Sequence, residues 1–88
     1  MTILEILATG FGIGTGIANI PQIIKIFRNK SAKDISIITM TIFLLSSIVW
    51  LLYGIELSSF ALISANILYV ITYVIIIFGF VLYGRKKE

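Results

Sequence analysis

Residues 57–84 read LSSFALISANILYVITYVIIIFGFVLYG, a run of 28 residues without a charge. Two more uncharged stretches precede it, residues 6–24 and residues 35–55, with 19 and 21 residues. About 20 helical residues cover the roughly 30 Å hydrocarbon layer of a bilayer, so each stretch can cross it. Membrane β-strands would alternate apolar and polar residues over about 10 positions, and no such alternation occurs. The sequence therefore predicts an all-α membrane protein with three transmembrane helices, at about residues 3–28, 35–55 and 58–83.

Composition indicates that lipid, not water, is the main solvent of the chain. Of its 88 residues, 59% are hydrophobic and 12% are charged, whereas soluble domains have about half and about a quarter. Cys and His are both absent, so the chain lacks thiol chemistry, an imidazole base and the commonest transition-metal ligands. We therefore expect one transmembrane domain over residues 1–88, with no metal, no other cofactor and no enzyme activity.

Charge placement predicts the orientation in the membrane. The first connection and the end of the chain hold the basic residues Lys25, Arg28, Lys30, Lys33, Arg85, Lys86 and Lys87. The N-terminal end and the second connection hold Glu5 and Glu56. The positive-inside bias then places the N-terminus outside and the C-terminus in the cytoplasm. We interpret the basic residues as a topology signal with affinity for anionic membrane lipid, and not as a nucleic-acid site.

Trp50 and Asn66 are expected at one depth in the membrane. Each lies eight residues from Ser58, the centre of the second connection, and so about 12 Å from that turn. An amide and an indole N–H need polar partners away from water. Together they suit a sugar ring, whose C–H face packs on the indole and whose hydroxyls bond to the amide. Singly, each also fits a structural role, Trp at an interface and Asn between helices.

Each span carries one face of polar and aromatic side chains at helical spacing. The faces are Thr15, Asn19 and Gln22 in the first span, Phe43, Ser46, Trp50 and Tyr53 in the second, and Asn66, Tyr69 and Tyr73 in the third. Their convergence would form a wet cavity, and the lack of a mid-span carboxylate favours passive movement of a neutral solute. Three helices enclose only a slot, whereas six surround a sugar-sized cavity, so we expect a parallel homodimer of six helices.

The sole proline and a cluster of four glycines lie in the first span. Pro21 is expected to bend that helix, either as a passive kink or as a hinge for its inner half. Two pairs of glycines four residues apart, Gly10 with Gly14 and Gly12 with Gly16, predict close helix packing on two sides.

Motifs along nearly the whole chain resemble the bacterial SemiSWEET sugar transporters, half-size relatives of SWEET proteins in the PQ-loop group. The motifs are Pro21-Gln22, KSAKDIS at residues 30–36, WLLYG at residues 50–54 and Ala65-Asn66. Three spans, this orientation and a separation of 16 residues between Trp50 and Asn66 make the combination specific. The resemblance implies one triple-helix bundle with the third helix between the first and second. It also implies a parallel homodimer around the sugar path and a location in the bacterial inner membrane.

The resemblance also implies roles for individual residues. Trp50 and Asn66 would contact sugar, and Tyr53 would help to close the outer gate. Pro21 and Gln22 would form a hinge near the cytoplasmic gate.

Some positions depart from the family pattern, and the roles of two others are inferred only from their depth in the membrane. Position 19, often aromatic in relatives, is Asn here, so Asn19 is expected to add a hydrogen bond to the substrate pocket. Leu57 and Ser59 stand approximately where some relatives have a charged pair at the outer gate. Depth suggests Met40 and Phe43 for the cytoplasmic gate, with lipid-facing packing as the alternative.

The sequence thus predicts a facilitative uniporter that moves sugars of the glucose or sucrose class by alternating access. Two alternatives remain open at this stage. One is a transporter of another small solute, such as an amino acid or drug exporter, which the missing mid-span carboxylate disfavours. The other is a small structural membrane subunit whose polar faces bind partner helices.

Overall fold

The computed structural model describes residues 2–32 and 35–83, and the regular structure in them is helical. The helices are α1 (Ile3–Ile17), α2 (Ile20–Asn29), α3 (Ile37–Leu57) and α4 (Phe60–Tyr83). With α1 and α2 counted together as Ile3–Asn29, three helical spans are long and apolar enough to cross a membrane. The prediction of an all-α fold with three such spans is confirmed.

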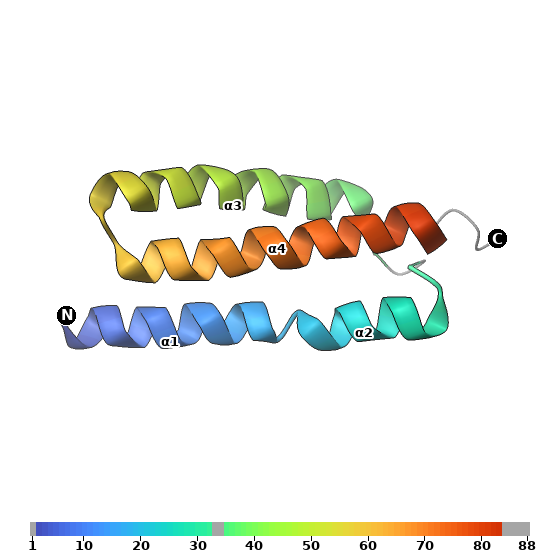
Figure 1. Ribbon diagram of the computed structural model, residues 1–88, viewed down its shortest axis with the longest axis horizontal. Coiled ribbons are helices and arrows are strands. Elements are labelled where there is room, and N and C mark those ends of the chain that lie inside the picture. Colours follow the sequence, from blue (N-terminus) through green and yellow to red (C-terminus); the bar gives the residue numbers. More distant parts are fainter. Residues whose placement is uncertain (1, 33–34, 84–88) are drawn as a thin grey trace.

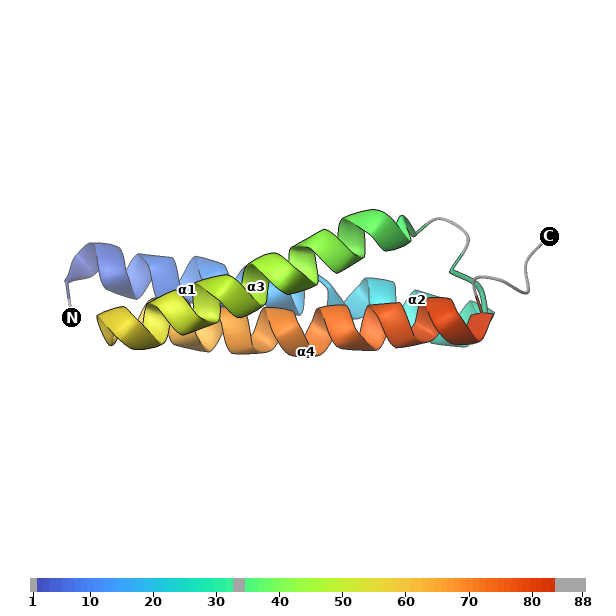
Figure 2. The same ribbon diagram turned by 90° about the horizontal axis from the view of Figure 1, so that it is seen from above.

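The helix α4 is the central element of the bundle. It packs against α1, α2 and α3, and Figure 1 shows it between α3 on one side and the line of α1 and α2 on the other. The third span therefore lies between the first and the second, as the resemblance implied. Viewed from above in Figure 2, α3 meets α4 at their connecting turn and diverges from it toward its own first residue.

The first span is two helices and not one bent helix. The backbone N–H of Asn19 donates to the Gly16 carbonyl at 3.1 Å, a bond of the tighter 3₁₀ type. Regular bonding resumes when the Ile23 N–H donates to the Asn19 carbonyl at 3.1 Å. Pro21 lies in the first turn of α2, where a missing N–H costs nothing because the first turn has no acceptor for it. Proline therefore begins a new helix here and does not interrupt the interior of one.

The ends of α3 differ from the sequence prediction by two residues each. The helix begins at Ile37 because Ser36 caps it, with the Ser36 hydroxyl accepting from the Thr39 N–H at 3.2 Å. Gly54 lies inside the helix and not at its end. Its missing side chain leaves room for α4, since a Cβ on Gly54 would lie 2.7 Å from the Cβ of Leu62.

In the second connection, one serine ends α3 and the next one caps α4. Ser58 takes the left-handed conformation, with φ 54°, and ends α3. The hydroxyl of Ser59 accepts from the Leu62 N–H at 3.2 Å and so caps the start of α4. The third span thus starts at the cap formed by Ser59.

Most large apolar side chains of the three spans face outward. The buried core is small, formed by Ile26, Ala32 and Ile76 near the end of α2. Long stretches of α1 and α3 expose aliphatic and aromatic side chains, such as Phe11 and Val49. In a soluble protein such a surface would aggregate. It fits a chain that lipid or a second copy surrounds.

Candidate functional site

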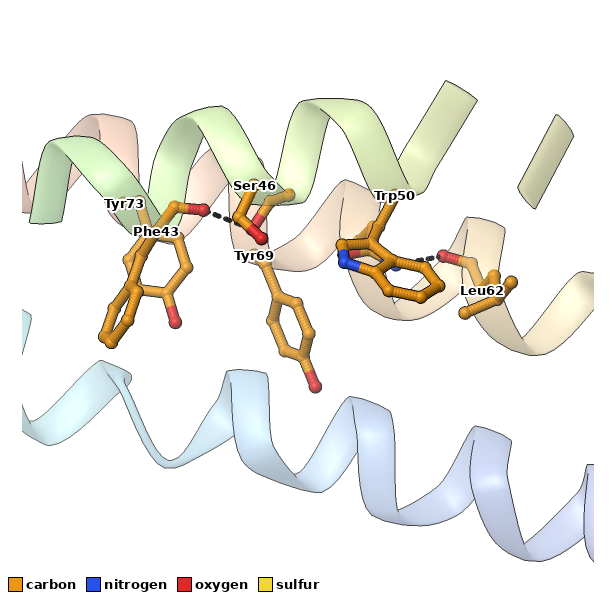
Figure 3. Close-up of a pocket in the computed structure, with 8 residues that line it drawn as sticks. Phe43, Ser46, Trp50, Leu62, Tyr69 and Tyr73 are labelled. Carbon is orange, nitrogen blue, oxygen red and sulfur yellow. Dashed lines mark hydrogen bonds between the residues drawn. The ribbon is translucent and has the colours of Figure 1, made fainter. Parts of the chain in front are cut away.

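A pocket with a volume of about 390 Å³ lies between α3 and α4. Figure 3 shows the side chains that line it, which extend from α3 and α4 toward the side of α1 and α2. The lining residues are Phe43, Ser46, Ser47, Trp50, Leu62, Asn66, Tyr69 and Tyr73. All of these side chains are uncharged, and half of the eight are aromatic. The pocket is therefore suited to a neutral solute with both polar and apolar surfaces.

The structure brings Trp50 and Asn66 to this same pocket. Asn66 is buried, and its side-chain N–H donates to the Leu62 carbonyl, one turn earlier in α4, at 2.8 Å. This bond fixes the amide, whose remaining donor and oxygen can serve a ligand. Trp50 is 49% exposed and packs edge to face on Tyr53, with ring centroids 5.7 Å apart. A large part of the indole therefore remains uncovered within one protomer.

Aromatic rings tilted against one another form the wall nearer to α2. Phe43 and Tyr73 have ring centroids 5.6 Å apart, and Tyr69 and Tyr73 have centroids 6.3 Å apart. Figure 3 shows these rings pointing the same way from their helices. Ser47 is buried, and its hydroxyl donates to the Phe43 carbonyl at 2.8 Å. Rings in mutual contact are held in place, so this wall is preorganised for the C–H face of a ligand.

Charged side chains lie at the two ends of the molecule. Glu5 is in the first turn of α1, and Glu56, the sole charged residue of α3, is near the turn into α4, at the same end in Figure 1. Lys25, Arg28 and Lys30 are exposed at the opposite end. The helix α4 carries no charge at all. Four other basic residues used for the orientation, Lys33, Arg85, Lys86 and Lys87, lie outside the described residues.

Comparison with known proteins identifies the family. A family model described as sugar efflux transporter for intercellular exchange matches residues 2–88. A sugar transporter SemiSWEET of Escherichia coli (strain UMEA 3162-1) is 41% identical over 64 residues, which are 70% of this chain and 72% of the relative. The crystal structure of a bacterial homologue of SWEET transporters matches with a TM-score of 0.88 and 30% identity, covering 94% of this chain and 100% of that one. The chain belongs to the SemiSWEET family of sugar transporters.

Membership in the SemiSWEET family assigns the chain to sugar transport and not to catalysis. It is a membrane protein with three apolar spans in a bacterial transporter family. Within residues 2–32 and 35–83, no three His, Cys, Asp or Glu side chains gather where they could hold a metal ion.

The three residues expected near the gates occupy different positions relative to the pocket in this SemiSWEET. Phe43 lines the pocket. Met40, one turn earlier, packs against the buried cluster of Ile26, Ala32 and Ile76. Tyr53 touches Trp50 but is not among the residues that line the pocket.

The candidate residues of the first span lie away from the pocket lining. Pro21 is exposed and Gln22 is half-buried on α2. Asn19, expected to bond to substrate, is directed to α4 instead, where its side-chain N–H donates to the Thr72 hydroxyl at 3.3 Å. Thr72 is buried and in turn donates to the Tyr69 carbonyl at 3.1 Å.

Sequence reasoning missed two lining residues, Ser47 and Leu62, and the partner of Asn19. Ser47 adjoins the polar face of α3, so widening that face by one residue would have found it. Leu62 carries no polar signal, and its place at the pocket follows only from its position one turn before Asn66. The partner, Thr72, is one of several polar residues of α4 and belongs to none of the faces that the sequence indicates. To pair Thr72 with Asn19, one must know how the first span is aligned along α4. Neither stretch of sequence gives that alignment.

Proposed function

We propose that this SemiSWEET is a facilitative transporter that moves mono- or disaccharides by alternating access as a parallel homodimer. The observation that carries the proposal is the meeting of Trp50 and Asn66 in one uncharged pocket. The indole face would pack on the C–H surface of a sugar ring, and the Asn66 amide would bond to its hydroxyls. Sugars of the glucose or sucrose class have both kinds of surface.

Exposure of the pocket residues supports the homodimer. Phe43, Trp50 and Tyr53 are 43%, 49% and 46% exposed, although each has polar or aromatic character that suits a cavity better than lipid. A second copy that faces the first across the pocket would cover them and would supply a second Trp50 and Asn66. Since the charge bias orients every copy alike, the two-fold axis would run along the membrane normal.

The charge distribution supports an orientation with the N-terminus outside and the C-terminus in the cytoplasm of a bacterial inner membrane. The end with Lys25, Arg28 and Lys30 would then lie at the cytoplasmic surface, in reach of anionic lipid headgroups. Glu5 and Glu56 would lie at the outer surface.

The gates would lie above and below the pocket along this axis. Tyr53, one turn beyond Trp50 toward the outer surface, would close the outer side. Phe43, with Met40 beside it, would close the cytoplasmic side. Pro21 and Gln22, in the first turn of α2, would form the hinge that lets α2 change its angle to α1.

Transport would be uniport, driven by the sugar gradient alone. The carboxylates of the described helices, Glu5 and Glu56, lie at one end of the molecule. The described helices thus place no acid between the two surfaces to carry a proton alongside the sugar.

Counterflow in liposomes tests the proposal. Purified protein is reconstituted into vesicles loaded with unlabelled glucose or sucrose, and uptake of the labelled sugar is measured. We expect the parental chain to accumulate label, and Trp50→Ala and Asn66→Ala to lose uptake while remaining folded in the bilayer. Val49→Ala is the matched control, because Val49 is exposed on α3 next to Trp50 and does not line the pocket. Normal uptake by both pocket variants would refute the site, and no uptake of either sugar by the parental chain would favour a structural subunit.

A further inference from the structure

The first span keeps one register against α4 on both sides of the helix break. Three contacts spaced seven residues apart on the first span meet three residues of α4 with the same spacing. The contacts are Gly12 with Ala65, Asn19 with Thr72 and Ile26 with Gly79. A seven-residue repeat is the geometry of helices that wind around one another along a shared seam. The break therefore interrupts the first span without shifting its alignment on α4.

The contacts at the two ends of this seam are close and apolar. A Cβ on Gly12 would lie 2.8 Å from the Cβ of Ala65, and a Cβ on Gly79 would lie 2.8 Å from Cγ2 of Ile26. Contacts of this kind hold helices together but select an alignment weakly, because one apolar side chain replaces another when the helices slide.

The central contact is polar. The Asn19 side-chain N–H donates to the Thr72 hydroxyl at 3.3 Å, and this hydroxyl donates to the Tyr69 carbonyl at 3.1 Å. Thr72 is 3% exposed. Sliding the helices by one turn would place Asn19 beside Leu68 or Ile76, which have no polar side-chain atom, and would leave the amide and the hydroxyl without their partners. The other hydrogen bond of this seam, from the Tyr69 hydroxyl to the Gly12 carbonyl at 2.8 Å, uses a backbone acceptor that recurs along α1 and so selects the alignment less sharply. A polar side-chain pair in a mainly apolar seam is known to fix register, at some cost in stability.

We propose that Asn19 and Thr72 are positioning residues that hold the first span in register on α4 while the break bends. The inference rests on the proposed alternating access, in which α2 changes its angle to α1. Asn19 lies next to the break itself, so its bond to Thr72 places the pivot at one point along α4. Neither residue lines the pocket, and their contribution is to the rate of the conformational change and not to the affinity for sugar.

Substitutions at Thr72 separate this role from simple packing. Thr72→Val keeps the shape of the side chain and removes the hydroxyl, whereas Thr72→Ser keeps the hydroxyl. Thr9→Val is the matched control, because the Thr9 hydroxyl donates to the Glu5 carbonyl within α1 at 2.8 Å and joins no second helix. In counterflow we expect Thr72→Val to lower the maximal rate about fivefold, as the loss of one interhelical hydrogen bond allows. Its KM should stay within about twofold of the parental value, and Thr72→Ser and Thr9→Val should match the parental rate.

Thermal unfolding separates positioning from stabilisation. A pair that serves only to hold the helices together would lower the unfolding midpoint when both of its members are replaced by apolar residues, as in the double variant Asn19→Leu/Thr72→Val. A register-fixing pair costs stability relative to an apolar pair, so we expect this double variant, which leaves neither polar group unpaired, to unfold at the parental midpoint or above it. Thr72→Val alone leaves the Asn19 amide without its partner and should lower the midpoint.

Spin-label distances test the register without any transport assay. The chain contains no cysteine, and the exposed residues Lys25 on α2 and Phe78 on α4 can be replaced by cysteine and labelled. Labelled chains diluted in an excess of unlabelled chains report the distance within one protomer. We expect Thr72→Val and Asn19→Leu to broaden this distance distribution, and Thr72→Ser to leave it unchanged.

The outcomes are distinct from those of the proposed function. If the parental chain moves no sugar, the distance distribution alone decides the inference. If the parental chain transports, an unchanged rate and an unchanged distribution in Thr72→Val would overturn the positioning role and leave the transporter intact. A raised KM at an unchanged maximal rate would overturn it as well, because it would place Thr72 in the sugar site.

Discussion

Gly12 of α1 faces Ala65 of α4 with no space for a side chain between them. A Cβ on Gly12 would lie 2.8 Å from the Cβ of Ala65 and 3.8 Å from the Tyr69 hydroxyl. Gly10, on another face of the same helix, would bring its Cβ within 4 Å of no atom in the described residues. The face of α1 that carries Gly12 thus requires glycine for its contact with α4. The face that carries Gly10 has no such contact within a protomer.

Alanine at these two glycines should therefore have opposite effects on stability. Gly12→Ala forces α1 away from the rigid Cβ of Ala65, and we expect a loss of about 1–3 kcal/mol. Gly10→Ala should be neutral or slightly stabilising, since alanine is the better helix former. Denaturation by SDS followed by circular dichroism measures both. Equal losses in the two variants would contradict the assignment of the α4 contact to the Gly12 face.

Removal of the Tyr69 hydroxyl tests a hydrogen bond between α1 and α4. That hydroxyl donates to the Gly12 carbonyl at 2.8 Å, whereas the ring lines the pocket. Tyr69→Phe should lower stability by about 0.6–1 kcal/mol, typical of a hydrogen bond between membrane helices. The retained ring should keep the counterflow KM close to the parental value. A large rise in KM with unchanged stability would mean that the hydroxyl serves sugar and not α1.

Pro21→Ala tests the hinge. Proline in the first turn of α2 keeps α1 and α2 apart, since its ring and missing N–H prevent a continuous helix across residues 17–21. With alanine, the N–H of residue 21 can donate to the Ile17 carbonyl and join the two helices. We expect a fall of about tenfold in the maximal counterflow rate, equivalent to about 1.4 kcal/mol on the barrier. Ile24→Ala, an exposed change on α2, is the control, and a parental rate in Pro21→Ala would exclude a required bend.

An imposed pH gradient should have no effect on sugar movement. The pocket is lined by uncharged side chains, the chain has no His, and Glu5 and Glu56 lie at one end of the molecule. Liposomes with equal sugar on both sides and a proton gradient of about two pH units should therefore show no net uptake. Accumulation that collapses with a protonophore would show coupling and would count against uniport.

Much of the fold follows from the sequence, because hydrocarbon leaves few alternatives to a helix for an uncharged stretch of this length. The ends of the helices follow less well. A glycine such as Gly54 is read as a terminator from sequence, yet here it serves the contact with Leu62 inside α3. Pro21 indicated a discontinuity correctly, but the sequence did not distinguish a kink from two separate helices.

The candidate site likewise has a part that follows from the sequence and a part that does not. The sequence pairs Trp50 with Asn66 because each lies eight residues from the same tight turn. Residues at equal separation from a tight turn lie at the same depth in the membrane. Asn19 could not be placed by depth, since its partner depends on how the first span rotates and slides on α4. That alignment depends on contacts with α4, such as the bond from Asn19 to Thr72, which lies 53 residues further along the chain.

The orientation can be decided with single cysteines in a chain that has none of its own. Lys30→Cys places a thiol just after α2, and Glu56→Cys places one at the opposite end, in the last turn of α3. With intact bacterial cells, a membrane-impermeant maleimide should label Glu56→Cys and should label Lys30→Cys only after the cells are opened. Phe11→Cys, exposed midway along α1, is the control, because lipid should protect it in both cases. Labelling of Lys30→Cys in intact cells would reverse the orientation. Equal labelling of both end positions would mean that the copies insert in both directions, so that the charge bias would no longer support a parallel pair.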